Sequence, residues 1–194
     1  PNSHGGMLRK VQNKEQQIIE LFRRGDASAM DELYACYADY LTAVCYRYIP
    51  DDDKLKDVLQ ESFIKIFTKV SDFEYRGAGS LKAWLTRIVV NEALNALRRE
   101  GAAHEQKLAT NLPDLPDEEP DVGELNEETL LGMIGRLPQG CRTVFNLFVM
   151  EDKSHKEIAA CLGIKPDTSA SQLHKAKALL ARMINEYRRK NGQT

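Results

Sequence analysis

Five polar or aromatic side chains recur at steps of three and four residues in one stretch of the chain: Trp84, Arg87, Asn91, Asn95 and Arg98. Residues with this spacing share one face of an α-helix. Guanidinium groups neutralise phosphate, Asn amides bond base edges, and an indole stacks on an unpaired base. This face has no carboxylate, so we predict that it binds nucleic acid. The alternative is an ordinary solvated face beside a core tryptophan.

The preceding segment, residues 73–80, extends this predicted surface. It places two aromatic rings and a cation, Phe73, Tyr75 and Arg76, next to flexible glycines. Ser80 stands where a residue that caps the helix N-terminus is expected.

A further amphipathic helix is predicted before this segment. Its apolar positions are Leu59, Phe63, Ile66, Phe67 and Val70, which we expect to face the core. Its polar positions include Asp57, Gln60, Glu61 and Lys65, which are offered to solvent or to a partner.

The C-terminal part contains the signature of a helix-turn-helix. Ser154 and Glu157 have the spacing of a capping box, Gly163 ends the helix that follows, and Pro166 opens the next helix at a permitted first-turn position. In such motifs the second helix enters the DNA major groove. We therefore assign DNA contacts to six of its early residues: Thr168, Ser169, Ser171, Gln172, His174 and Lys175. A three-helix protein-binding module is the alternative.

The remaining pattern is helical, without strand signals, and the charge is segregated. Residues 101–129 carry a net charge of −8 and contain three prolines, whereas residues 153–194 carry +6. A proline-interrupted acidic stretch cannot bury enough surface to fold alone. We predict an all-α fold with two small helical domains, residues 7–100 and 124–194, joined by an acidic flexible linker at residues 101–123. Pro1 to Gly6 are expected to be a cloning remnant, with Met7 as the natural start.

Composition and motifs exclude several classes of function. The 194 residues include no run of 18 apolar residues and no signal-peptide pattern, which predicts a cytoplasmic protein without membrane insertion. The four cysteines form no CxxC pair and are expected to be reduced core thiols, so neither a metal site nor a cofactor is predicted. His104, His155 and His174 lie in separate segments without a nucleophile or phosphate loop, so no enzyme is predicted, and His155 is expected to face solvent in the first turn of its helix.

Two parts of the chain resemble a known family. Asp57–Phe63, Lys82–Ile88 and Asn91–Arg99 look like region 2 of the extracytoplasmic-function (ECF) sigma factors, and Thr168–Lys177 looks like their region 4 recognition helix. The resemblance implies an alternative sigma factor that binds core RNA polymerase through Asp57, Gln60, Glu61 and Lys65. It further implies minus-10 promoter DNA at Phe73, Tyr75, Arg76 and the 84–98 face, minus-35 DNA at the early residues of the recognition helix, and an anti-sigma factor as inhibitor.

The sequence departs from the family in the recognition helix. Ala170 replaces a basic residue, Gln172 stands where Arg is common, and Lys165 occupies a usual serine cap position. Fewer charges weaken nonspecific phosphate attraction. The main alternative is a free-standing helix-turn-helix repressor or activator whose first domain binds an effector or dimerises, and a helical adaptor without DNA affinity is the third.

Overall fold

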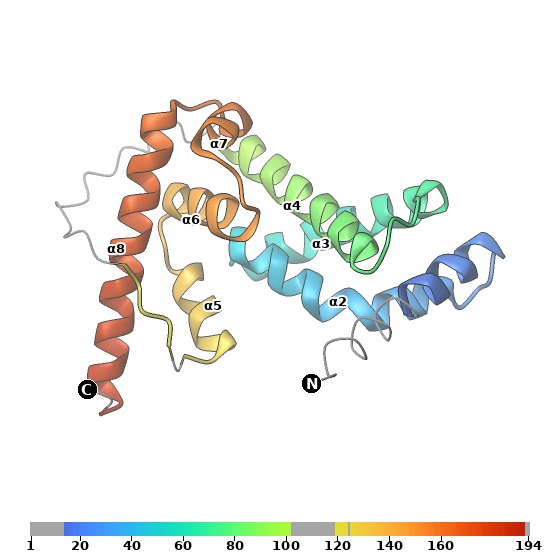
Figure 1. Cartoon of the computed structure of the whole chain (residues 1–194), viewed down its shortest axis with the longest axis horizontal. Coiled ribbons are helices and arrows are strands. Elements are labelled where there is room, and N and C mark those ends of the chain that lie inside the picture. The colour runs from blue at the N-terminus through green and yellow to red at the C-terminus, as the bar shows by residue number, and fades with distance from the viewer. Residues whose placement is uncertain (1–13, 102–118, 124, 193–194) are drawn as a thin grey trace. The chain divides into compact units, whose positions relative to one another are not determined.

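The computed structural model describes residues 14–101, 119–123 and 125–192 (Figure 1). Residues 14–23 are helical, and the named helices that follow are α2 (Ala29–Tyr48), α3 (Asp52–Lys69), η1 (Val70–Asp72), α4 (Ser80–Gly101), α5 (Glu127–Gly135), α6 (Gln139–Phe145), the π-helical turn η2 (Asn146–Met150), α7 (His155–Leu162) and α8 (Pro166–Lys190). No strand occurs in these ranges, so the fold is all-α as predicted.

The chain divides into two compact units. Among the described residues, the first unit comprises residues 14–45 with Asp51–Arg98, and the second comprises Tyr46–Pro50 with residues 99–101, 119–123 and 125–192. This confirms the two helical parts expected from the sequence. Of the predicted linker, residues 102–118 lie outside the described residues, as do the six N-terminal residues expected to be a remnant.

In the first unit, α2, α3 and α4 pack around a shared apolar core. Leu33, Leu41, Ile66, Leu81 and Leu85 are completely buried there. The side chain of Asp51 caps α3 by accepting a hydrogen bond from the backbone of Lys54 at 3.0 Å. The helices are also joined by side chains, because the Tyr34 and Phe63 rings lie 5.2 Å apart and the Tyr40 and Thr86 hydroxyls 3.0 Å apart.

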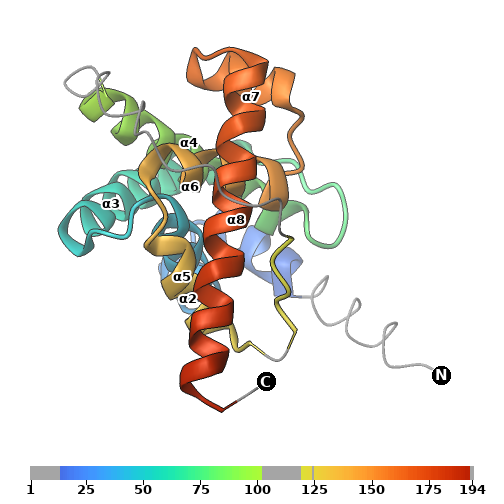
Figure 2. The same ribbon diagram turned by 90° about the vertical axis from the view of Figure 1, so that its left-hand side faces the viewer.

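The second unit is built on α8. This helix packs against α6 and α7, and α7 lies beside its N-terminal half (Figure 2). Both bonds of the predicted capping box between Ser154 and Glu157 are present at the start of α7. Gly163 ends α7 with φ of 69°, a left-handed conformation that glycine adopts without steric cost. The turn and Pro166 then start α8, which confirms the helix-turn-helix.

The end of the acidic stretch lies along α8. Glu119 forms an ion pair with Lys177 at 2.7 Å, and the guanidinium of Arg188 donates hydrogen bonds to the Asp121 carboxylate and to the backbone oxygens of Asp121 and Gly123. The hydrogen bond from the Gly123 amide, followed by the Arg188 guanidinium, holds the pKa of Asp121 below its ordinary value. Residues 119–123 are therefore attached to the second unit.

Two local expectations are wrong. Ser80 is the first residue of α4 and not its cap, and its hydroxyl accepts a hydrogen bond from the backbone amide of Arg76 at 3.2 Å. The cysteines are not all core thiols, because Cys36 is exposed on α2 and Cys161 is half-buried, while Cys45 and Cys141 are buried. None of the described helices is both long and apolar enough to cross a membrane.

Candidate nucleic-acid interfaces

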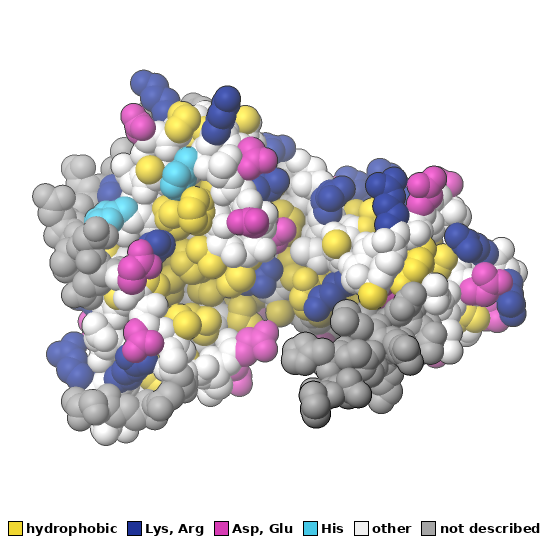
Figure 3. Space-filling view, viewed as in Figure 1, with side chains coloured by type: hydrophobic (Ala, Val, Ile, Leu, Met, Phe, Trp, Pro, Cys, Tyr) yellow, Lys and Arg dark blue, Asp and Glu magenta, His cyan; other side chains and the backbone are white. Residues whose placement is uncertain are grey.

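The polar stripe predicted on α4 is accessible to solvent. Arg87, Asn91 and Arg98 are exposed, and Trp84 and Asn95 are half-buried at its edge. Figure 3 shows Lys and Arg side chains gathered over the part of the first unit formed by α3, α4 and the segment between them. A cationic face with amide side chains is suited to hold phosphates and base edges.

The segment before α4 brings aromatic rings to this face. Phe73 packs on Trp84 with ring centroids 5.2 Å apart and planes tilted by 48°. Arg76 is exposed and lies 3.4 Å from the Glu74 carboxylate. Gly77 and Gly79 have φ of 117° and 86°, conformations that L side chains rarely adopt. These glycines let the chain turn sharply and bring Phe73 back onto the first turns of α4.

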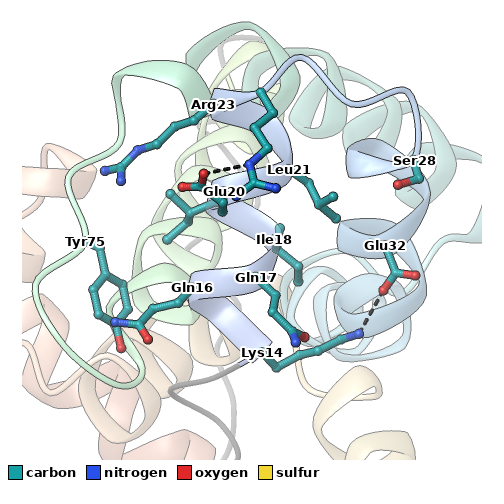
Figure 4. Close-up of a pocket in the computed structure, with 12 residues that line it drawn as sticks. Lys14, Gln16, Gln17, Ile18, Glu20, Leu21, Arg23, Ser28, Glu32 and Tyr75 are labelled. Carbon is teal, nitrogen blue, oxygen red and sulfur yellow. Dashed lines mark hydrogen bonds and ion pairs between the residues drawn. The ribbon is translucent and has the colours of Figure 1, made fainter.

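Tyr75 occupies a different environment from Phe73. Its side chain is half-buried and lines a pocket against the helical segment 14–23, where its ring lies beside Gln16 (Figure 4). The same pocket contains the ion pair between Lys14 and Glu32 at 2.8 Å.

A carboxylate that the sequence reasoning overlooked lies beside the α4 stripe. Glu92 is buried, pairs with Lys65 of α3 at 2.5 Å, and accepts a long hydrogen bond from the Asn95 amide at 3.5 Å. Asn95 in turn accepts a bond from Arg98 at 3.1 Å. Of the two asparagines, Asn91 is exposed and Asn95 is half-buried. In the sequence, the one sign of this buried pair is that Glu92 stands among the apolar positions of α4.

The four residues predicted to bind a partner on α3 differ in their contacts. Asp57, Gln60 and Glu61 are exposed, and Lys65 is also accessible but committed to Glu92. The apolar positions opposite are less deeply buried than expected, because Leu59, Phe63 and Phe67 are half-buried while Leu55, Val58 and Ile66 form the core contact. Lys65 therefore links α3 to α4 in addition to facing solvent.

The early part of α8 presents most of the predicted contacts outward. Thr168, Ser171 and His174 are exposed, and Gln172 and Lys175 are half-buried. The Cys141 thiol of α6, itself buried, donates a hydrogen bond to Oε1 of Gln172 at 2.9 Å. Burial raises the pKa of this thiol while nearby Lys175 opposes the change. The sequence held no signal for this contact between positions far apart in the chain.

Ser169 is a correction to the predicted DNA contacts. Its side chain is completely buried, and its hydroxyl lies 2.9 Å from Nδ1 of His155 on α7. The His155 ring stacks on Phe148 with centroids 4.8 Å apart, so this histidine is not the solvent-facing residue that was expected. Ser169 points into the unit because it shares a helix face with Leu173 and Ala176, four and seven residues further on, which are buried.

No group of three or more His, Cys, Asp or Glu side chains suited to a metal ion occurs in the described ranges. What the two units offer is surface for binding polymers: an amide and guanidinium face with adjoining aromatic rings in the first unit, and a helix-turn-helix in the second. Both kinds of surface are typical of DNA recognition.

Two family models match separate parts of the chain. Residues 33–103 match sigma-70 region 2, and residues 127–180 match sigma-70 region 4. Together they span more than half of the chain. The helical fold and these matches define a sigma factor of the sigma-70 type with regions 2 and 4.

The named relatives of this chain show which group of sigma factors it belongs to. The chain is 29% identical over 178 residues to the ECF RNA polymerase sigma factor SigE of Mycolicibacterium smegmatis, covering 88% of this chain and 68% of the relative. It is 29% identical over 183 residues to the ECF RNA polymerase sigma-E factor of Haemophilus influenzae, covering 88% and 95%. The chain belongs to the ECF sigma factors. Sigma factors are the DNA-recognition subunits of RNA polymerase and are not themselves enzymes, so this protein is not an enzyme.

Among solved structures, the chain matches the sigma factor RpoE from Bartonella quintana, which was crystallised with the anti-sigma factor NepR. That chain is 21% identical, the TM-score is 0.47, and the match covers 82% of this chain and 98% of the other.

Proposed function

We propose that this ECF sigma factor binds core RNA polymerase through the first unit, opens the minus-10 element with the same unit, and recognises the minus-35 element with the second. The assignment divides the chain into residues 7–100, a linker at 101–123, and residues 124–194. The observation that carries it is the exposed, amide-rich face of α4 with the Phe73–Trp84 pair at its start. Duplex DNA binding alone requires no such aromatic pair.

Opening of the minus-10 element needs groups that hold unpaired bases. Stacking on an aromatic ring is worth about 1–3 kcal/mol per base and tolerates any base. Phe73 and Trp84 supply rings, Asn91 supplies an amide, and Arg76, Arg87 and Arg98 supply charge for phosphates. Asn95, which bonds to Glu92 and Arg98, belongs to the same proposed surface, and so does Tyr75, which lines the pocket beside residues 14–23.

Core polymerase is the proposed partner of the α3 face. Asp57, Gln60 and Glu61 project from a helix whose opposite side is buried, so a partner can bind them without disturbing the core. Lys65 lies at the edge of this surface and pairs with Glu92.

The minus-35 duplex is the proposed ligand of α8. Thr168, Ser171, Gln172, His174 and Lys175 form the contact set, and Ser169 is left out because it is buried. Gln172 contacts a base edge, and Lys175, one turn further on, contacts a phosphate.

The protein acts in the cytoplasm with its polymerase and is inhibited by an anti-sigma factor. The matched RpoE was crystallised with such an inhibitor.

Reconstitution with sigma-free core polymerase tests this function. Transcription should start at defined sites only when the protein is added, and permanganate should detect unpaired thymines near minus-10. A protein that binds duplex operators but never directs initiation would be a helix-turn-helix repressor or activator instead. Absence of any salt-dependent DNA affinity would point to an adaptor.

A further inference from the structure

Glu15 is a completely buried carboxylate that none of the proposed promoter contacts uses. It lies on the helical segment 14–23, between exposed neighbours Lys14 and Gln16. Burial of a carboxylate is costly unless hydrogen bonds compensate for the lost water. Two backbone amides supply them here: Gly79 donates to Oε2 at 2.9 Å, and Lys82 donates to Oε1 at 3.1 Å.

Both donors belong to the start of α4. Gly79 immediately precedes the helix and Lys82 is its third residue, so these amides lack partners within the helix. In a capping box the same positions are satisfied from within the first turn. Here the acceptor comes from 64 residues earlier in the chain. The negative charge also faces the positive end of the helix dipole, which stabilises it.

Other groups at this end of α4 complete the arrangement. Tyr37 of α2 donates its hydroxyl to Oε1 of Glu15 at 3.4 Å, and burial together with the nearby Glu15 raises the pKa of Tyr37, so the phenol keeps its proton. Ser80 is used differently, since its hydroxyl accepts the Arg76 amide. Among the described residues, Glu15 is the one side chain that accepts hydrogen bonds from the Gly79 and Lys82 amides.

The segment 73–79 is therefore fixed at both ends. Phe73 holds its beginning against Trp84, and Glu15 holds its end at Gly79. Between them, Gly77 and Gly79 adopt positive φ values and would otherwise leave the segment many conformations. A segment already ordered in its binding conformation loses less entropy when it captures a ligand.

We propose that Glu15 is a positioning residue that pre-organises the segment 73–79 and the first turn of α4 for capture of unpaired minus-10 bases. The inference rests on the proposed promoter opening by this surface. It assigns a role in DNA capture to a residue outside the resemblance to region 2, whose matched residues begin at position 33.

The first test measures the cap itself. Glu15→Gln keeps the size of the side chain but replaces one acceptor oxygen with an amide donor that opposes a backbone N–H. Amide hydrogen exchange, followed by NMR on the full chain, should accelerate by about tenfold at Gly79 and Lys82, because a charge-assisted hydrogen bond is lost. Exchange at Val89 and Leu94, further along α4, should not change. Glu20→Gln on the same helical segment, which breaks only the exposed pair with Arg24, is the matched control.

The second test measures capture of unpaired bases by the reconstituted holoenzyme. Affinity for a forked DNA with an unpaired minus-10 strand should fall by about tenfold in Glu15→Gln, the loss expected for one charge-assisted bond that orders the binding segment. Core polymerase affinity and binding to a minus-35 duplex should stay at the wild-type level. Tyr37→Phe, which removes only the long bond, should give a much smaller effect.

The outcomes separate this inference from the proposed function. Unchanged exchange at Gly79 and Lys82, or forked-DNA affinity equal to wild type, overturns the positioning role of Glu15. A parallel loss of core, duplex and forked-DNA binding also overturns it, because that pattern indicates general unfolding. If the wild-type holoenzyme itself binds forked DNA no better than duplex, the proposed promoter opening fails instead.

Discussion

The hydroxyl of Ser169 and Nδ1 of His155 lie 2.9 Å apart and join the two helices of the helix-turn-helix. Ser169 is completely buried, and His155 is fixed on its other side by the ring of Phe148. A hydroxyl within the predicted DNA-reading run thus serves to set the position of α8 on α7. Its exposed neighbour Thr168 remains a DNA contact in our proposal.

Substitution of these two neighbours should separate stability from DNA binding. Ser169→Ala removes a buried hydrogen bond and should lower the free energy of unfolding by about 1 kcal/mol without altering base preference. Thr168→Ala should leave the melting temperature unchanged and weaken duplex binding. Thermal melting and DNA titration of both variants provide the measurement. If Ser169→Ala weakened binding at full stability, Ser169 would be a DNA contact after all.

Gln172 and Lys175 should differ in the kind of DNA affinity that they provide. Gln172→Ala should cost roughly 1–3 kcal/mol on the preferred site and flatten discrimination at one base pair, whereas Lys175→Ala should weaken all duplexes and reduce the salt slope by about one. Salt titrations against a minus-35 duplex and its single-base variants measure both effects. Uniform weakening by Gln172→Ala would assign this residue to the DNA backbone.

The asparagines of α4 should act after the first encounter with the promoter. Asn91→Ala should reduce permanganate-detected opening more than closed-complex formation, because the Asn91 amide is exposed and can meet an unpaired base. Asn95→Ala also breaks bonds to Glu92 and Arg98, so a lower melting temperature is expected for this variant alone. Equal loss of both steps in Asn91→Ala would exclude a role in opening.

Polymerase affinity should depend on the exposed residues of α3. Combined Gln60→Ala and Glu61→Ala changes should weaken binding to core enzyme with little change in melting temperature, because neither side chain is buried. Lys65→Ala should also destabilise the fold, since it leaves the buried Glu92 carboxylate without its cation. Asp39→Ala on α2, another exposed position, is the control. Unchanged core affinity in the double variant would remove this face from the docking surface.

The capping box of α7 should make stability depend on pH. Hydrogen bonds from the Ser154 backbone and hydroxyl lower the pKa of Glu157. Because the pKa is lower in the folded state, this stabilisation is present above the unfolded pKa and is lost as the pH falls through the folded value. Glu157→Gln should melt below wild type at neutral pH, and the difference should shrink as the pH falls below the ordinary glutamate range. A constant difference over this range would contradict an electrostatic contribution.

Features that depend on neighbours in the chain could be predicted from the sequence. The Ser154–Glu157 capping box, the left-handed Gly163 and the first-turn Pro166 are determined by backbone preferences within a few residues, and the structure contains all three. The spacing of Arg87, Asn91 and Arg98 likewise placed these side chains on one exposed face, because helical periodicity alone decides which positions align.

The sequence by itself therefore determined the all-helical fold, its division into two units and the polar faces of α4 and α8. Only the tertiary structure decided which side chains on those faces are engaged elsewhere. Glu15 capping α4, Cys141 bonding Gln172 and His155 holding Ser169 each join residues at least 14 positions apart, and Glu92 binding Lys65 does the same between α3 and α4. Such contacts arise from the packing of one helix against another, and the period of a single helix carries no information about that packing.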